Sequence, residues 1–514
     1  MSIINKNDIL KVLISYNPWW KTNEVPTDTI KDMKRTAFYE AKKAFNNKEI
    51  RRYVLLTGAR RVGKTTILYQ LIDELIKSGV EPKDILYVSF DNPILKFCKL
   101  NELLDLYEVN LSGDGTKYLF FDEIQYAEDW NNWLKVLYDQ NPNSHVMATG
   151  SASPVITEGV VESGTGRWVT ITVPTLSFYE YCKLVEQKGK PVTVSDLDVL
   201  SVEQVNELLT GQFFNANKKT ELSGLDEKLP KDFTIENLKN IKEKELGDVV
   251  NTLSILQKHF NRYIKIGGFP ELVKSSDEAY AQKILREDIV DKVLKRDIPS
   301  LFNIRNINIL EKVFLYLCFN TSNIINYTSM CKELDNTALA TVQEYIRFLK
   351  NANLIYESTP IKGNILKSKP KVYIVDSAIR NAVLMRDDII TDPKEMGYSV
   401  ETAVYRHVYT YMRKYNGNVG YYRDNKTEKE IDIIGNSVKE NLYIEVKYRE
   451  KTELNKENAL YNIPNVDDYI YIVTKDALDY GIIKLKDGKT VIKIPAFAFL
   501  YILGRQEEKS NEVE

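Results

Sequence analysis

The sequence has few cysteines and histidines and lacks a long apolar run. Its four cysteines (Cys98, Cys182, Cys318 and Cys331) are widely spaced without a C-x-x-C pair, and its three histidines are scattered. A zinc site is therefore not expected, and a reducing compartment suits unpaired thiols. No apolar run approaches the ~18 residues of a membrane span, and the N-terminus shows no charged-then-apolar signal pattern. We expect a cytoplasmic protein with no membrane partner.

Neither sign of charge is in clear excess. The chain has 70 lysine and arginine residues against 72 aspartate and glutamate residues, a net charge of -2. It therefore lacks the overall basic character of a nucleic-acid-binding protein, and any DNA binding must be local. The 514 residues suit roughly three or four domains. A hydrophobic fraction of 43% can supply their cores.

The most informative stretch begins at Gly58 and fits the phosphate-binding pattern G-x-x-x-x-G-K-[ST]. An apolar run precedes it, and apolar residues at helical spacing follow it. The glycines let backbone N–H groups point at a triphosphate, beside the positive end of a helix. Lys64 can reach the β and γ phosphates, and the Thr65 hydroxyl can ligate Mg²⁺. The expected cofactors are ATP and Mg²⁺, and the predicted nucleotide-binding residues are Gly58, Ala59, Arg60, Arg61, Val62, Gly63, Lys64, Thr65 and Thr66.

Two later apolar runs end in the polar residues that a phosphate loop requires. The first ends in Asp122, predicted to hold Mg²⁺ through its water shell, and Glu123, predicted to orient and deprotonate the attacking water. The second leads to Thr149 and Ser151, either of which could touch the γ-phosphate or the water. The alternative for these two is an ordinary strand-to-turn cap. Strands alternating with helices predict a parallel sheet covered on both faces.

Arg167 follows two nearby glycines and is a candidate arginine finger. It would act either within one subunit or across an interface, and the alternative is a surface arginine. Action across an interface requires an oligomer, so we expect a homo-oligomer.

Five motifs together resemble a family of prokaryotic AAA+ ATPases: Gly58–Thr66, Phe120–Gln125, Ala148–Ser151, Leu176–Tyr181 and Gly267–Glu271. Members of that family carry a C-terminal domain with a restriction-endonuclease-like core. The resemblance implies a P-loop ATPase core over residues 31–185, after an N-terminal segment at 1–30. A helical insertion and lid would follow at 186–300. The charged stretch around 215–235 is expected to be a mobile loop with its lysines in solvent, and DNA contact is the alternative.

Residues 301–360 show the three-helix rhythm of a winged helix–turn–helix. The expected helices are Ile307–Phe319, Tyr327–Leu334 and a third that Thr337 caps, with an extended wing after it. The third helix would lie in the major groove of DNA and offer Thr341, Gln343, Glu344, Arg347 and Lys350. Because this helix has few basic residues, a protein-contact or packing module is the alternative.

A second chemical site is expected within residues 361–505. Residues 429–435 and 441–447 look like two strands joined by turn residues, and alternation places Glu445 and Lys447 on one face. Asp432, on the preceding strand, and Glu401, on an earlier helix, can join them. Carboxylates hold hard cations such as Mg²⁺, which lower the pKa of bound water, and a lysine offsets negative charge. The pattern is similar to the PD-(D/E)XK nuclease superfamily, with Glu401 as the helical acid.

The predicted fold class is α/β: a P-loop parallel-sheet ATPase domain, a helical lid, a winged helix–turn–helix and a restriction-endonuclease-like α/β domain, with a disordered tail at 506–514. The functional hypothesis is ATP hydrolysis coupled to engagement of duplex or branched DNA, with metal-dependent endonuclease cleavage. The alternative is an ATP-gated switch or DNA-remodelling motor whose C-terminal domain only binds DNA or protein. The predicted catalytic residues are Glu123, Arg167, Asp432, Glu445 and Lys447, and the predicted metal ligands are Thr65, Asp122, Glu401, Asp432 and Glu445.

Overall fold

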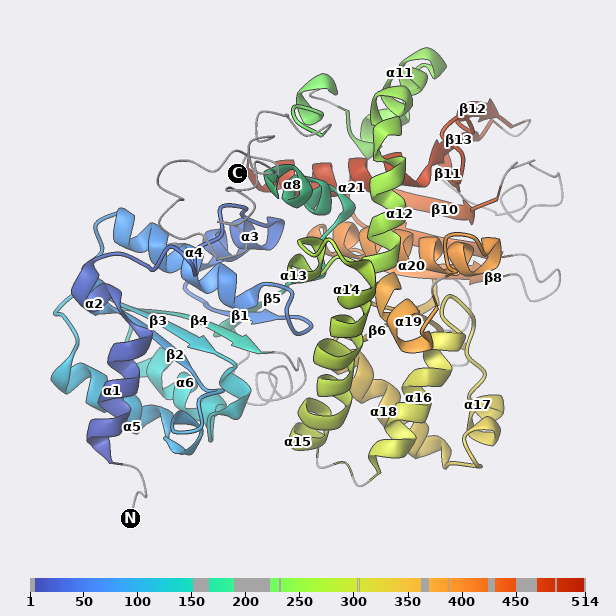
Figure 1. Ribbon diagram of the computed structural model, residues 1–514. Helices are drawn as coiled ribbons and strands as arrows, with labels where there is room; N and C mark the ends of the chain where they lie inside the picture. Colours follow the sequence, from blue (N-terminus) through green and yellow to red (C-terminus); the bar gives the residue numbers. More distant parts are fainter. Residues whose placement is uncertain are drawn as a thin grey trace, which may run out of the picture. The chain divides into compact units, whose positions relative to one another are not determined.

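A computed structural model of the chain divides into two compact units (Figure 1). The first unit is Met1–Pro174 with Ser300–Asn303 and Asn351–Asn353, and the second holds the rest. The first unit thus ends before the predicted boundary at residue 185, so the helix α8 (Phe178–Lys188) belongs to the second. The structure describes residues 5–150, 166–188, 222–230, 233–302, 304, 306–361, 369–386, 388–423, 430–449, 469–485 and 488–512.

A five-stranded parallel sheet forms the centre of the first unit, in the order β2-β3-β4-β1-β5. The strands are β1 (Tyr53–Thr57), β2 (Ile85–Ser89), β3 (Lys117–Asp122), β4 (Ser144–Gly150) and β5 (Trp168–Thr172). Helices α3 (Thr36–Phe45) and α4 (Lys64–Lys77) lie on one face, and α5 (Leu100–Asn110) and α6 (Trp130–Gln140) on the other (Figure 1). The predicted parallel sheet with two covered faces is confirmed.

The N-terminal residues pack on this sheet and are not a separate segment. Helix α1 (Lys6–Tyr16) places Ile9 and Leu13 in the same core cluster as α5 and α6. The short helix α2 (Trp19–Thr22) follows. The indole N–H groups of Trp19 and Trp20 donate to the Ile85 carbonyl, at 3.2 and 2.8 Å. The chain before residue 31 therefore completes the domain at the edge strand β2.

An eight-stranded mixed sheet lies in the second unit, in the order β12-β13-β11-β10-β9-β8-β6-β7. Its strands are β6 (Ile355–Pro360), β7 (Lys371–Ile374), β8 (Asn418–Arg423), β9 (Glu430–Asn436), β10 (Asn441–Lys447), β11 (Tyr469–Thr474), β12 (Gly481–Lys484) and β13 (Thr490–Pro495). Strand β6 pairs with both β7 and β8. The predicted boundary at 360/361 is therefore wrong, because the segment expected as a wing is a strand of the C-terminal sheet.

Helices surround this sheet in the second unit. They include α11 (Glu243–Leu253), α12 (Gln257–Ile266), α14 (Glu278–Ile284), α16 (Ile307–Phe319), α17 (Tyr327–Glu333), α18 (Leu339–Asn351), α19 (Ser377–Leu384), α20 (Pro393–Lys414) and α21 (Ala496–Glu512). The three helices expected over residues 307–351 are present. Thr337 does not cap the third, because that helix begins at Leu339 and its N-cap position is Ala338. In the part of the chain that the structure describes, no helix is long and apolar enough to cross a membrane.

The predicted disordered tail is instead the end of helix α21, which continues to Glu512. Arg505 is buried and donates to the carbonyls of Pro230 and Phe233, at 3.1 and 3.2 Å. Gln506, also buried, accepts from the Ile235 N–H at 2.8 Å. These polar side chains are buried because a segment distant in sequence satisfies them. The predicted loop at 215–235 is likewise packed where it is described, since Leu225 and Leu229 are buried.

Two of the resemblance motifs lie together in the second unit. Gly268, in the motif Gly267–Glu271, lies against the first residue of the motif Leu176–Tyr181. A Cβ on Gly268 would lie 2.6 Å from the Leu176 carbonyl oxygen. The Leu176 N–H donates to the Gly268 carbonyl at 2.6 Å, and the Phe178 N–H donates to His407 Nε2 at 2.8 Å. Burial lowers the pKa of His407, so the imidazole is a neutral acceptor. These motifs have a structural role.

Candidate functional sites

The phosphate loop joins β1 to α4, as the sequence predicts, and its glycines are required by its backbone. Gly58 has φ 146° and Gly63 has φ 97°, both in the region that favours glycine. A Cβ on Gly58 would also lie 2.2 Å from the Val173 carbonyl oxygen. The buried Lys64 donates from Nζ to the carbonyls of Gly58 and Ala59, each at 2.9 Å. The ammonium group is thus held across the loop, where a phosphate would be bound.

Asp122 lies beside the loop and accepts hydrogen bonds from three hydroxyl groups. Thr65 donates at 2.9 Å and Tyr87 at 3.0 Å, both to Oδ2, and Thr149 donates to Oδ1. Burial and the neighbouring Glu123 raise the pKa of Asp122, and burial and Asp122 raise that of Tyr87, which stays a donor. The predicted pair Thr65 and Asp122 offers hydroxyl and carboxylate oxygens, the ligand chemistry that Mg²⁺ takes. Because the three donors are neutral, the residues fit a cation at this carboxylate.

Glu123 and Thr149 are connected to each other as well as to Asp122. Glu123 has a left-handed backbone, φ 51°, which turns the chain at the end of β3. Its N–H donates to Thr149 Oγ1 at 3.0 Å, and the Gln125 amide donates to its carboxylate. Glu123 is half-buried beside the loop. Thr149 therefore positions both acids, and Ser151 lies outside the described residues.

Arg167 lies at the opposite end of the strands from the phosphate loop. It precedes Trp168, which pairs with Tyr53 at the start of β1, whereas the loop follows Thr57 at the end of β1. The four residue steps from Tyr53 to Thr57 separate these two ends of β1 by about 13 Å. Arg167 forms a two-fold pair with Asp139, at 2.9 and 3.1 Å. The alternative that Arg167 acts on its own subunit's phosphate loop is therefore wrong.

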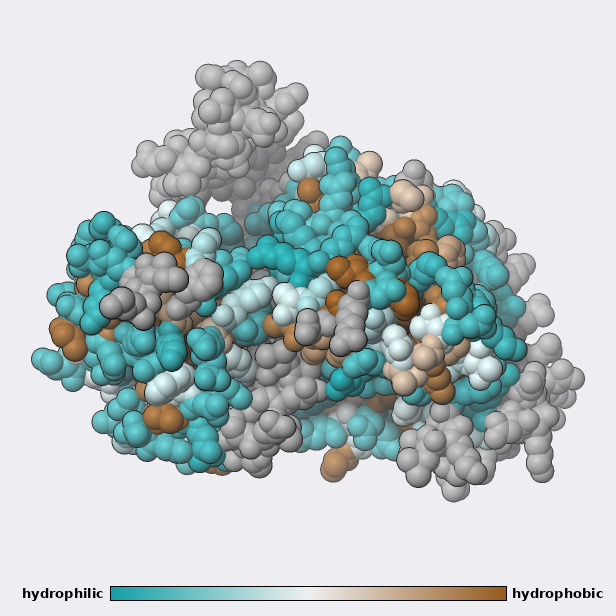
Figure 2. All heavy atoms as spheres, turned by 90° about the horizontal axis from the view of Figure 1, so that it is seen from below, coloured by the Kyte–Doolittle hydropathy of each residue, from teal (hydrophilic) through white to brown (hydrophobic). Residues whose placement is uncertain are grey.

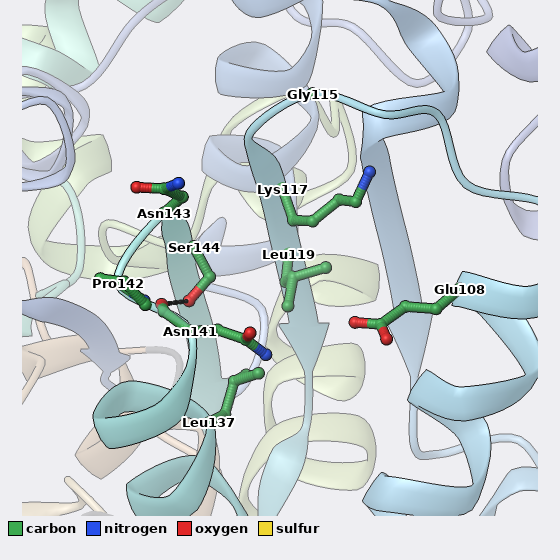
Figure 3. Close-up of a pocket in the computed structure, with 9 residues that line it drawn as sticks. All are labelled: Glu108, Gly115, Lys117, Leu119, Leu137, Asn141, Pro142, Asn143 and Ser144. Carbon is green, nitrogen blue, oxygen red and sulfur yellow. Dashed lines mark hydrogen bonds between the residues drawn. The ribbon is translucent and has the colours of Figure 1, made fainter.

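A cavity of about 220 Å³ opens at the same end of the sheet as Arg167, where the strands begin (Figure 3). Its lining includes Lys117 and Ser144, the first residues of β3 and β4. The Lys117 side chain pairs with Asp84 at 2.6 Å. The cavity is distant from Lys64 and is not the nucleotide site.

Sequence reasoning missed two residues of the first site. Tyr87 donates to Asp122, and Arg35, which is buried, donates from one guanidinium nitrogen to the Val62 carbonyl at 2.7 Å and the Pro174 carbonyl at 2.8 Å. Arg35 thereby joins the phosphate loop to the chain that leaves β5. Neither residue belongs to a spaced motif, so no signal in the sequence identifies it.

The second unit brings the four predicted residues of the second site together. Glu401 comes from α20, Asp432 from β9, and Glu445 and Lys447 from β10. Asp432 Oδ2 accepts from the Val446 N–H at 2.8 Å, and Lys447 pairs with Glu445. Burial first, and then Asp432, raise the pKa of Glu445 to about 8. Burial, with Asp432 acting against Lys371, raises the pKa of Glu401 to about 7.

Strand β7 adds two residues that sequence reasoning missed at this site. Lys371 is buried and its Nζ lies 3.4 Å from Glu401 and also pairs with Glu430. The Tyr373 hydroxyl donates to Glu401 at 2.9 Å. Although burial disfavours the Lys371 ammonium, Glu401 and the other acids raise its pKa. Strand β7 reaches this site because it pairs with β6, which in turn pairs with β8. The spacing of residues along the sequence does not reveal these pairings.

The second site is a network of acid–lysine pairs rather than a converged metal centre. Among the described residues, no three carboxylate, histidine or cysteine side chains are arranged to hold a metal ion. Asp432, Glu401 and Glu445 each have a protein donor, as given above. Glu445 Oε2, however, is buried without a hydrogen-bond partner in the described part of the chain. That oxygen is a carboxylate acceptor of the kind that hard cations take as a ligand.

The face predicted to read DNA is exposed but not basic. On α18, Gln343, Glu344, Arg347 and Lys350 are exposed and Thr341 is half-buried, while Lys350 pairs with Glu357 at 2.9 Å. Residues 301–360 contain five basic side chains (Arg305, Lys312, Lys332, Arg347, Lys350) and five acidic ones (Glu311, Glu333, Asp335, Glu344, Glu357). In Figure 2 the described residues are mostly hydrophilic, with apolar ones among them. Electrostatic attraction to DNA would therefore be weak.

Comparisons with known families agree with the geometry of the first site. Residues 50–182 match a family described as an AAA domain. Residues 257–389 and 396–497 match two families described as domains of unknown function, DUF8612 and DUF4143. The first match, with the parallel sheet and the phosphate loop of the first unit, supports an AAA-type ATPase fold for this segment. The other two leave the chemistry of the second unit open.

Two relatives span most of the chain. An uncharacterized protein of Methanocaldococcus jannaschii is 27% identical over 413 residues, covering 79% of this chain and 76% of the relative. One of Haemophilus influenzae is 24% identical over 433 residues, covering 82% and 88%. Solved structures with some similarity include the Aeropyrum pernix ORC2 protein, with 12% identity, 71% and 97% coverage and TM-score 0.33. The ORC1 protein of that organism, in complex with DNA, has 11% identity, 73% and 97% coverage and TM-score 0.29. Scores of this size carry no functional argument.

The raised pKa values of the second site predict a stability that falls with increasing pH. Below about pH 4.5 both carboxyls are protonated in the folded and unfolded chain. Between there and the folded values of about 7 and 8, the folded chain binds more protons than the unfolded chain, so each pH increase favours unfolding. Glu445→Gln removes one such group. The unfolding free energy of the variant minus that of wild type should increase by on the order of 2 kcal/mol from pH 5 to pH 8.

Urea denaturation with EDTA at several pH values measures this difference. Glu344→Gln, at an exposed position on α18, is the control and should follow the wild-type curve. Parallel stability curves for wild type and Glu445→Gln would contradict the prediction.

Proposed function

We propose that the protein is an ATPase that hydrolyses ATP at the phosphate loop and couples hydrolysis to engagement of DNA. The observation that supports the ATPase most is the assembly of Lys64, Thr65, Asp122 and Glu123 around one end of the sheet. Each comes from a different point of the loop or of β3, and Thr149 joins the two acids.

The roles of the residues follow from their chemistry. The loop N–H groups and Lys64 bind the phosphate oxygens. Thr65 and Asp122 would hold Mg²⁺, which when bound offsets the charge of the triphosphate. Glu123, half-buried and held by Gln125, orients the attacking water and takes its proton. Thr149 fixes the backbone and carboxylate that these two acids depend on.

Two variants separate nucleotide binding from hydrolysis. Lys64→Ala is expected to abolish measurable binding of ATP, because it removes the cation of the loop. Glu123→Gln should still bind ATP but lose turnover by about a hundredfold or more, the usual loss of a general base. Phosphate release and binding of a fluorescent ATP analogue measure the two steps. The exposed Glu128→Gln is the control, and a Glu123→Gln protein with wild-type turnover would exclude the proposed role.

Arg167 is proposed to complete the site of a neighbouring subunit in a homo-oligomer. Its place at the far end of the strands, its half-buried side chain and its exposed partner Asp139 put it at the surface that another copy could contact. In that case Arg167→Ala should lose turnover by on the order of 10³ while still binding ATP.

Mixing the two inactive variants tests this arrangement. Lys64→Ala subunits keep Arg167, and Arg167→Ala subunits keep an intact phosphate loop, so a mixture should regain part of the turnover. A monomer in ATP by light scattering, or a mixture as inactive as its components, would contradict action across an interface.

A second candidate activity is metal-dependent cleavage of DNA at the second site. The gathering of Glu401, Asp432, Glu445 and Lys447 favours it, as does one buried Glu445 oxygen that has no hydrogen-bond partner among the described residues. Glu445, Asp432 and Glu401 would hold the cation, which when bound would activate water. Lys447 and Lys371 would balance the charge of the cluster and of a bound phosphodiester. Exposed residues of α18 are proposed to contact the DNA.

Labelled linear, branched and single-stranded DNA, incubated with ATP and Mg²⁺ or Mn²⁺, tests this candidate. We expect cutting by wild type and none by Glu445→Ala, and Lys64→Ala shows whether ATP controls it. Arg347→Ala should weaken DNA binding and lower its salt dependence by about one ion, with the exposed Lys332→Ala as the control. Absence of cutting with DNA-stimulated ATP turnover retained would favour the switch or motor alternative. Absence of both would exclude the proposed coupling to DNA.

A further inference from the structure

The edge strand β2 brings one tyrosine to the metal end of the ATPase site. Tyr87 is 3% exposed, and its hydroxyl donates to Asp122 Oδ2 at 3.0 Å. Thr65, the other proposed magnesium ligand, donates to the same oxygen at 2.9 Å. Tyr87 and Thr65 thus donate to the same carboxylate oxygen from two different elements, β2 and α4. The hydroxyl restricts where Oδ2 can point.

Residues of the N-terminal helices hold Tyr87 in place. The Tyr87 N–H donates to Asn17 Oδ1 at 2.6 Å, and Asn17 Nδ2 donates to the Tyr87 carbonyl at 2.9 Å. The buried Asn17 amide therefore pairs with the outer edge of β2 as a neighbouring strand would. The Tyr87 ring packs edge-on against Tyr16, with centroids 6.0 Å apart, and against Tyr69 at 4.8 Å. Asn17 and Tyr16, which lie outside the matched AAA segment, thus hold the backbone and one side of the ring, and Tyr69 holds the ring from within that segment.

We propose that Tyr87 is a positioning residue for the magnesium carboxylate Asp122, and that the N-terminal helices hold it there through Asn17. This inference rests on the proposed ATPase function. Tyr87 itself does not touch the nucleotide. It keeps Asp122 Oδ2 beside Thr65, so that two oxygen ligands are in place before a cation arrives. The N-terminal residues are accordingly part of the ATPase site and not only a cover for the sheet.

The Tyr87→Phe variant removes only the hydroxyl and keeps the packing of the ring. We expect it to weaken binding of the non-hydrolysable analogue AMP-PNP by about tenfold in Mg²⁺ or Mn²⁺, the size of a lost bond to a charged group. Binding in EDTA should be unchanged, because Lys64 and the loop N–H groups remain. Isothermal titration calorimetry measures both conditions. The half-maximal Mg²⁺ concentration for turnover should rise by a similar factor.

Tyr107→Phe is the matched control. Tyr107 is equally buried in the same unit, but its hydroxyl donates to the Lys83 carbonyl at 2.6 Å. The control should lose stability by a similar amount and keep full dependence on metal. Asn17→Ala leaves the Tyr87 hydroxyl and removes its backbone support, and should weaken metal-dependent binding in the same direction by a smaller factor.

The outcomes distinguish this inference from the proposed function. If wild type binds AMP-PNP with metal and Tyr87→Phe binds it equally well, the role of Tyr87 is excluded and the ATPase stands. A Tyr87→Phe protein that loses binding equally in EDTA would show general damage to the site and would also overturn the inference. If wild type binds no nucleotide under any condition, the ATPase function itself fails, and this role with it.

Discussion

The first unit depends on the hydrogen bonds that protein hydroxyl groups donate to one buried carboxylate. Asp122 is 5% exposed and accepts from hydroxyl groups of three elements, the loop helix, the edge strand and the strand next to it on the other side. Hydroxyls satisfy the carboxylate oxygens with hydrogen bonds and supply no positive charge of their own. A lysine in the same place would have removed the reason for a cation to bind.

The second unit shows the opposite solution to the same problem. Its buried acids face Lys371 and Lys447, and the pairs satisfy most of their oxygens. Balanced pairs of this kind cost desolvation and repay it through geometry. The two sites therefore differ in the groups that surround their buried carboxylates. The first surrounds its acid with neutral hydroxyls, whereas the second has its own lysines and, in the described part of the chain, one Glu445 oxygen without a hydrogen-bond partner.

How far the sequence predicts the sites depends on how local their determinants are. The phosphate loop is continuous in sequence, so Gly58, Gly63 and Lys64 could be placed from spacing alone, and Asp122 and Glu123 follow a recognisable apolar run. Glu445 and Lys447 could be paired because side chains alternate on a strand. Tyr87, Arg35 and Lys371 could not be found, since each acts through a single contact with an element distant in the chain. The domain boundaries at 185 and 360 were wrong for the same reason: strand pairing and helix packing cross them. The charged end of α21 was misjudged because charge indicates solvent only where no distant partner satisfies it.

The side-chain cover of strand β2 has a consequence for how this domain behaves as a fragment. Asn17, Trp19 and Trp20 bond the outward-facing backbone groups of Ile85 and Tyr87, which an edge strand would otherwise leave unpaired. Unpaired edges recruit strands from other molecules. A fragment cut to the AAA-matched residues 50–182 would expose that edge together with the apolar surface under α1. We expect such a fragment to add strands from its neighbours and aggregate, because residues 5–23 cover this edge of the sheet.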